Sequence, residues 1–111
     1  MKKIAGFFLI AVFATVLVYT FNVGNTQGWS FFTPFLNDIL AMNWAGQFNV
    51  DFSFFLIFTG LWIAWRNKFN ATGIGLGLFT LVGGIPFVSV YLFILSLKKN
   101  TTMKEMLIGE N

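Results

Sequence analysis

Long apolar runs bounded by short basic clusters are the feature that most limits how this chain can fold. The basic residues stand at positions 2–3, 66–68 and 98–104, and the runs between them are rich in Phe, Leu, Ile and Val. Only 10% of the residues are charged, whereas about 25% are charged in a typical soluble domain. So few charges cannot cover the surface of a soluble protein of this size. The sequence therefore predicts an all-α integral membrane protein.

Three apolar runs are each predicted to cross the bilayer as a helix, at residues 4–21, 46–65 and 72–97, within a single domain of residues 1–99. The first run could instead be the apolar part of a secretory signal peptide, but it lacks a clear cleavage site of small residues, which favours an uncleaved helix. The apolar sequence after Asp51 supplies only about 21 Å of helix. The second span must therefore start before Asp51 to cross a hydrocarbon core of about 30 Å.

Shorter segments connect and follow these spans. Residues 30–42 carry a helical stripe of aromatic and aliphatic side chains but are too short to span, so they are predicted to form an amphipathic helix in the membrane interface. Residues 22–28 are rich in Gly and Asn and are predicted to form a loop. The polar C-terminal tail, residues 100–111, is predicted to be frayed.

The third run has small residues on one face and a helix breaker in its second half. Gly73, Gly77, Thr80 and Gly84 recur at helical spacing, a pattern that lets two membrane helices approach closely. This face is interpreted either as packing within the monomer or as an interface between copies of the chain. Pro86 cannot donate a backbone hydrogen bond, so a kink is predicted there.

The distribution of cations sets the predicted orientation. An odd number of spans places the basic residues at 2–3 and 66–68 on one side of the membrane and those at 98–104 on the other. Because the first group is larger, the positive-inside rule predicts a cytoplasmic N-terminus and a C-terminus outside. The predicted location is the cell membrane, as a multi-pass protein of a bacterial inner membrane.

Asp51 is the one carboxylate that the predicted spans place inside the hydrocarbon, where an ionised side chain costs about 2.5–3.5 kcal/mol at the centre. Counting inward from the outer ends of the neighbouring spans brings Tyr91, Ser89 and Tyr19 to a similar depth. These four side chains are therefore a candidate proton-binding or substrate-binding cluster. The alternative is that Asp51 lies in the first turn of its helix, where the helix dipole stabilises a carboxylate.

Composition excludes several kinds of chemistry. The chain has no Cys and no His, so it lacks a thiol nucleophile and the commonest metal ligand. We predict no catalytic residue, no cofactor and no metal site. The cations are not interleaved with aromatic residues, which argues against a nucleic-acid partner. The predicted partners are the lipid bilayer and either a second copy of the chain or a larger membrane protein.

Three motifs between Asn43 and Lys99 carry a resemblance to a known family. They are Asn43-x-x-x-x-Phe48-x-x-Asp51 entering a span, Trp65-Arg66-Asn67-Lys68 at its basic exit, and Gly84-Ile85-Pro86-Phe87 followed by Tyr91-Leu92. In these motifs the chain resembles small uncharacterised bacterial membrane proteins of the type catalogued as domain of unknown function 2834. The resemblance implies a multi-pass helical membrane protein and implies no activity. This chain has Ala64-Trp65 where the family has an acidic residue before the basic exit.

Three functional hypotheses remain open from the sequence. The leading one is a non-enzymatic membrane module that packs against itself or a larger membrane partner. The second is a small proton-coupled transporter that uses Asp51. The third is a membrane enzyme subunit that acts on a lipid or isoprenoid, with Asp51 as the acid.

Overall fold

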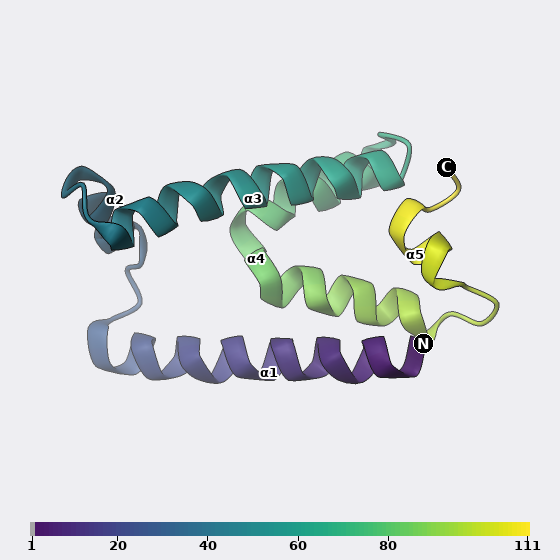
Figure 1. Ribbon diagram of the computed structural model, residues 1–111, viewed down its shortest axis with the longest axis horizontal. Helices are drawn as coiled ribbons and strands as arrows, with labels where there is room; N and C mark the ends of the chain where they lie inside the picture. Colours follow the sequence, from purple (N-terminus) through teal and green to yellow (C-terminus); the bar gives the residue numbers. More distant parts are fainter. Residues whose placement is uncertain (1) are drawn as a thin grey trace.

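The computed structural model describes residues 2–111, and all regular secondary structure in this range is α-helical. The helices are α1 (Lys2–Gln27), α2 (Phe32–Leu40), α3 (Trp44–Arg66), α4 (Ala71–Leu97) and α5 (Met103–Ile108) (Figure 1). Of these, α1, α3 and α4 are each long and apolar enough to cross a membrane. This confirms the predicted all-α fold with three candidate spans and shorter helices.

The first helix continues through the segment predicted to be a loop, so the loop prediction for residues 22–28 is wrong. The Thr26 hydroxyl donates to the carbonyl oxygen of Asn22 at 2.9 Å. Gly24 lies against the Trp29 ring, where an added Cβ would come within 2.5 Å of ring atoms. α1 is followed by Gly28, whose φ of 87° strongly favours glycine. Local hydrogen bonding and the packing of Trp29 therefore outweigh the turn preference of Gly and Asn.

The short helix α2 packs against the start of α3. α3 begins after Asn43, whose side chain accepts a hydrogen bond from the backbone N–H of Gly46 at 2.8 Å. Because Gly46 has no side chain, α3 approaches the carbonyl oxygen of Asp38 closely. The Asn49 amide donates to the carbonyl oxygen of Phe35 at 3.1 Å. These contacts tie α2 to the end of α3 that lies farthest from Arg66.

The fourth helix is interrupted at Gly84 rather than at Pro86. Gly84 has φ 60° and ψ −150°, a conformation that only glycine adopts readily. Pro86 follows in the first turn of the second half, where its missing N–H costs no helical hydrogen bond. The proline thus starts a new helix, and the preceding glycine supplies the change of direction.

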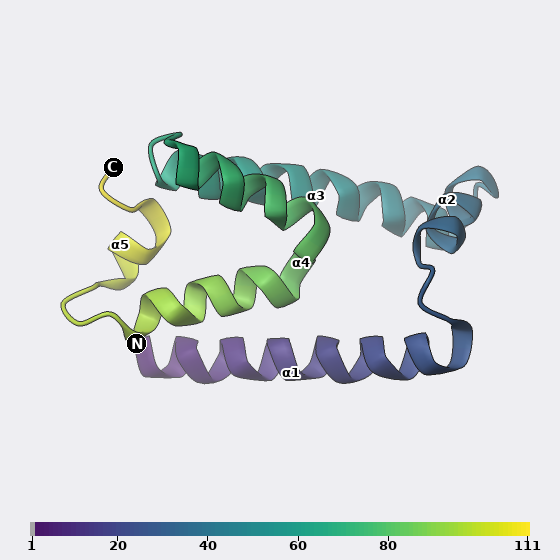
Figure 2. The same ribbon diagram turned by 180° about the vertical axis from the view of Figure 1, so that it is seen from behind.

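The two halves of α4 run in opposite directions. Residues 71–83 lie along α3, and residues 85–97 turn back to lie along α1 (Figures 1 and 2). Phe79 and Phe87, one on each side of the interruption, pack edge to face with ring centroids 4.8 Å apart. α4 therefore begins and ends at the same end of the molecule. The buried side chains lie mainly where α4 meets its neighbours, and they include Ile63, Thr80, Val88, Ser89 and Leu95.

The basic residues gather at one end of the fold, so the prediction that they divide between two ends is wrong. Lys2 Nζ donates to the carbonyl oxygen of Lys98 at 2.9 Å, and Arg66 donates to Tyr91 in the second half of α4. The prediction assumed that every apolar run extends once from end to end, whereas α4 doubles back. We call this part of the molecule the basic end. It holds Lys2, Lys3, Arg66, Lys68, Lys98, Lys99 and Lys104.

Candidate functional site

Arg66 is the centre of a polar network at the basic end. Its Nε donates to the carbonyl oxygen of Met106 at 2.6 Å, and its Nη2 donates to that of Glu105 at 3.0 Å. Its Nη1 donates to the Tyr91 hydroxyl at 2.9 Å, and the guanidinium carbon lies 5.7 Å from the centre of the Tyr91 ring. A single half-buried side chain therefore joins α3, α4 and α5.

Tyr91 has two further neighbours besides Arg66, namely Asn67 and Phe87. The Asn67 amide donates to its hydroxyl at 3.1 Å and to the carbonyl oxygen of Ile63 at 2.8 Å. The Tyr91 ring stacks on Phe87 with centroids 6.2 Å apart. The hydroxyl thus accepts hydrogen bonds from two side chains at the end of α3, and the second half of α4 is fixed against that end.

The C-terminal tail is folded, so the prediction of a frayed tail over residues 100–111 is wrong. The Thr102 hydroxyl accepts a hydrogen bond from the backbone N–H of Glu105 at 3.1 Å and caps α5. Met106 is only 3% exposed, and Trp62 Nε1 donates to the carbonyl oxygen of Leu107 at 2.7 Å. The sequence does carry a signal for this helix, because Thr102-x-x-Glu105 before apolar residues is a capping-box pattern.

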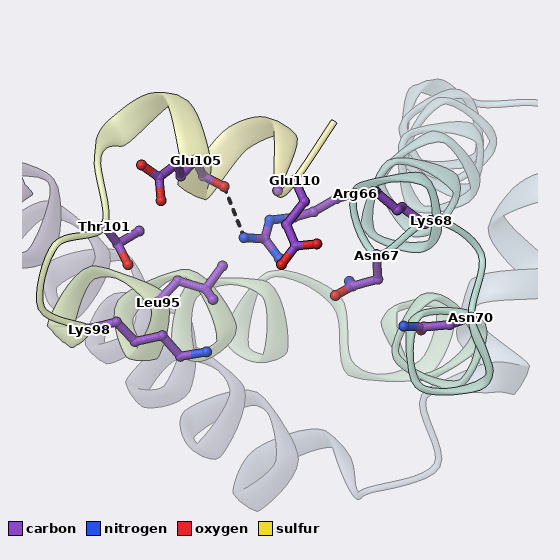
Figure 3. Close-up of a pocket in the computed structure, with 10 residues that line it drawn as sticks. Arg66, Asn67, Lys68, Asn70, Leu95, Lys98, Thr101, Glu105 and Glu110 are labelled. Atoms are coloured by element: carbon purple, nitrogen blue, oxygen red, sulfur yellow. Dashed lines mark hydrogen bonds between the residues drawn. The ribbon is translucent and has the colours of Figure 1, made fainter.

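A polar cavity of about 330 Å³ opens between the end of α3, the end of α4 and α5 (Figure 3). Three cations contribute to it, namely Arg66, Lys68 and Lys98. In Figure 3 the Glu105 carboxylate points away from the Arg66 guanidinium. The Lys98 side chain lies on the side of the cavity that the end of α4 forms. The complete lining is Arg66, Asn67, Lys68, Asn70, Leu95, Lys98, Thr101, Glu105, Gly109 and Glu110.

The predicted cluster around Asp51 is not assembled in the structure. Tyr91 contacts Arg66, which lies about 22 Å along α3 from Asp51. Ser89 is 1% exposed and donates to the carbonyl oxygen of Pro86. Within residues 2–111, no side-chain hydrogen bond joins Asp51 to Tyr91, Ser89 or Tyr19, and Tyr19 is 71% exposed on α1.

Asp51 itself lies well inside α3. The helix begins at Trp44 and has no acidic residue in its first turn, so the interpretation of Asp51 as a first-turn carboxylate is wrong. Asn43 performs the capping role instead. The Asp51 side chain is exposed and lies beside Gln47 and Phe55 in a shallow, mainly apolar surface depression.

The small residues of α4 lie in its contact with α3. A Cβ added to Gly77 would lie 2.6 Å from the carbonyl oxygen of Gly60, and one added to Gly73 would lie 2.6 Å from the Cβ of Asn67. Thr80 is fully buried, and its hydroxyl donates to the carbonyl oxygen of Leu76. The face formed by Gly73, Gly77 and Thr80 is therefore occupied within the monomer. Gly84 instead forms the turn between the two halves of α4.

Sequence reasoning placed the candidate site around Asp51 and missed the cavity at the opposite end of α3. The cavity combines side chains from three segments that lie far apart in the sequence, so no single motif marks it. Comparisons with protein-family models, with curated proteins and with solved structures found no match to this chain. The resemblance to the domain of unknown function 2834 family stays a prediction.

Proposed function

We propose that the chain is a non-enzymatic membrane module that crosses the bilayer with α1 and α3 and inserts α4 as a re-entrant hairpin. The observation that carries this proposal is the meeting of Lys2 with Lys98 at the basic end. With all the cations of residues 2–111 at that end, the positive-inside rule places it in the cytoplasm. Both chain ends then lie on the cytoplasmic side of a bacterial inner membrane.

The dimensions of α4 support a hairpin that enters the bilayer and returns. Each half is about 20 Å long, which is shorter than a hydrocarbon core of about 30 Å. The turn lies at the depth of Phe52, because a Cβ added to Gly84 would lie 3.8 Å from Cζ of its ring. An interrupted helix is tolerated at membrane depth where protein surrounds it. α1 and α3 provide such walls on two sides.

A second membrane-embedded chain fits the half of the molecule beyond this turn. Among residues 2–111, the extensive helix contacts are α3 with α4, α1 with α4, α2 with α3 and α4 with α5. Past Gly84, α1 and α3 continue without a third helix between them (Figure 1). The partner that we propose is another copy of the chain or a larger membrane protein, which would supply the missing helix.

Photo-crosslinking in native membranes tests the partner. A photoreactive residue replacing Phe21 on α1 or Phe48 on α3 would report on the half beyond the turn, and both positions are more than half exposed. The matched control is Phe7, which is also exposed on α1 but lies beside the second half of α4. We expect crosslinked protein from Phe21 and Phe48 and little from Phe7. The proposal would be contradicted by two results together. Photo-crosslinking at all three positions would yield only uncrosslinked monomer, and the protein would purify from mild detergent without a partner.

A second candidate function is proton-coupled transport through Asp51. One observation favours it, since the interruption of α4 at Gly84 lies at the depth of Phe52, the neighbour of Asp51. Interrupted helices at mid-membrane are common at transporter binding sites, and carboxylates at such depth often carry protons. Replacing Asp51→Asn should then abolish a pH-dependent flux in proteoliposomes. An unchanged flux in the correctly inserted variant would eliminate this function.

A further inference from the structure

We propose that the polar cavity at the basic end binds the phosphate group of a phospholipid headgroup. This inference goes beyond the proposed function, because it requires only that the basic end lie at headgroup depth. It does not depend on the direction of insertion or on a partner chain. Free phosphate offers the same chemistry, so the experiment below separates the two sources.

The positive charge of Arg66 is available to an anion. Its three hydrogen bonds go to two backbone carbonyls and a tyrosine hydroxyl, all of which are neutral groups. A guanidinium has five N–H donors, so two remain for a further acceptor. Because the three bonds fix the plane of the guanidinium, these donors are held in place before a ligand arrives. Planar paired donors of this kind suit phosphate oxygens.

Two lysines add to this charge from different walls of the cavity. Lys68 follows the end of α3, and Lys98 follows the end of α4. Lys98 is positioned by its backbone, because its carbonyl oxygen accepts the hydrogen bond from Lys2. Three cations from the ends of α3 and α4 therefore line a volume of about 330 Å³. This volume falls at the lower end of the roughly 300–1,000 Å³ found for small-molecule sites.

The two carboxylates that line the cavity do not oppose an anion equally. Glu105 is directed toward Thr102, whose hydroxyl donates to its Oε1 at 3.3 Å, and it points away from Arg66 in Figure 3. Glu110 is exposed and follows Gly109, near the end of the chain. Repulsion of a bound phosphate therefore comes mainly from Glu110, and removing that charge should strengthen binding.

The surroundings favour a lipid as the source of the phosphate. The cavity lies at the ends of two apolar helices, next to Trp62 and Trp65, and such aromatic residues mark headgroup depth. An apolar groove of about 250 Å³ runs along α3 and α4 from Phe69, the neighbour of Lys68, past Gly60 and Gly77. Gly60 and Gly77 form the floor of this groove, where the backbones of α3 and α4 meet. The groove and the cavity lie at the same end of α3, because Phe69 of the groove follows Lys68 of the cavity in the chain.

Calorimetric titration of the purified full-length protein in detergent tests the inference. The ligands are a soluble short-chain phosphatidylglycerol, the uncharged short-chain diacylglycerol without the phosphate, and inorganic phosphate. The cavity variant carries Lys68→Gln and Lys98→Gln, and the matched control carries Lys3→Gln and Lys104→Gln, which remove the same charge outside the cavity lining. We expect the cavity variant to bind phosphatidylglycerol about 30-fold more weakly, and the control to bind it like the original protein.

Several results would overturn the inference. Equal weakening in both double variants would show that general surface charge attracts the lipid. Binding of inorganic phosphate as tight as that of phosphatidylglycerol would overturn the lipid assignment, and so would equal binding of the diacylglycerol. Glu110→Gln provides a test that does not depend on the folding of the double variant. It should bind phosphatidylglycerol several-fold more tightly, and unchanged affinity would count against the cavity.

Discussion

Lys2 and Lys98 are separated by 96 positions in the sequence, yet Lys2 Nζ donates a hydrogen bond of 2.9 Å to the carbonyl oxygen of Lys98. Three apolar helices that each ran the length of the molecule once would place these residues at opposite ends. The contact exists because α4 reverses at Gly84. α4 therefore begins and ends at the same end of the molecule, although its length and apolar content would allow it to cross a membrane.

Labelling of single cysteines tests this topology directly, because the chain contains no native cysteine. Lys3→Cys and Lys104→Cys should both react with a membrane-impermeant maleimide from the cytoplasmic side only. Ser30→Cys, in the exposed connection between α1 and α2, should react from the other side. Labelling of residues 3 and 104 from opposite sides would show that α4 crosses the bilayer completely.

Gly84 is expected to be the most sensitive position in the interrupted region of α4. Its backbone conformation is strained for any residue with a Cβ, so Gly84→Ala should lower the free energy of unfolding by about 1–3 kcal/mol. The matched control is Gly75→Ala in the same helix, since a Cβ there meets nothing within 4 Å. Thermal unfolding in detergent, followed by circular dichroism, measures both. Equal stability of the two variants would argue that the turn at Gly84 does not form.

The close approach of α3 and α4 makes a separate prediction. A Cβ added to Gly77 would lie 2.6 Å from the backbone oxygen of Gly60, and a backbone atom cannot move aside as a side chain can. Gly77→Ala should therefore destabilise the protein by about 1–3 kcal/mol in the same unfolding experiment. If Gly77→Ala proved as stable as Gly75→Ala, the two helices would have to be farther apart than the structure places them.

The sequence predicts well those features that depend on the length and polarity of a segment. The apolar content of α1, α3 and α4 is enough to identify three candidate spans, because the bilayer selects for length and hydrophobicity. Length and hydrophobicity cannot distinguish a helix that crosses the bilayer from one that turns back within it. Gly84 and Pro86 mark an interruption in α4, but the angle between its halves depends on packing against α1 and α3.

The candidate site is harder to predict for a similar reason. Counting residues inward from the outer ends of the spans assumes that the spans are straight and antiparallel. Under that assumption Tyr91 lies near Asp51, whereas in the structure Tyr91 contacts Arg66. The docking of α5 depends on backbone carbonyls, which carry no residue-specific signal in the sequence. The Thr102-x-x-Glu105 capping-box pattern is a sequence signal for the helix in the tail, and it was not used in the prediction of a frayed tail.

Arg66 should control the docking of α5 through the geometry of its guanidinium. Lysine keeps the charge but has a single nitrogen, so Arg66→Lys cannot reproduce hydrogen bonds to Met106, Glu105 and Tyr91 at once. We expect the free energy of α5 docking to fall by about 2 kcal/mol. Hydrogen exchange of the α5 amides should therefore accelerate by roughly 30-fold.

Tyr91→Phe provides the graded comparison for this prediction. It removes the acceptor for Arg66 Nη1 and Asn67 Nδ2 but leaves both backbone contacts of Arg66 with α5 in place. Exchange in α5 should then change much less than in Arg66→Lys, while exchange in the second half of α4 should increase. If the two variants released α5 equally, Tyr91 rather than the backbone carbonyls would be the main anchor of the tail.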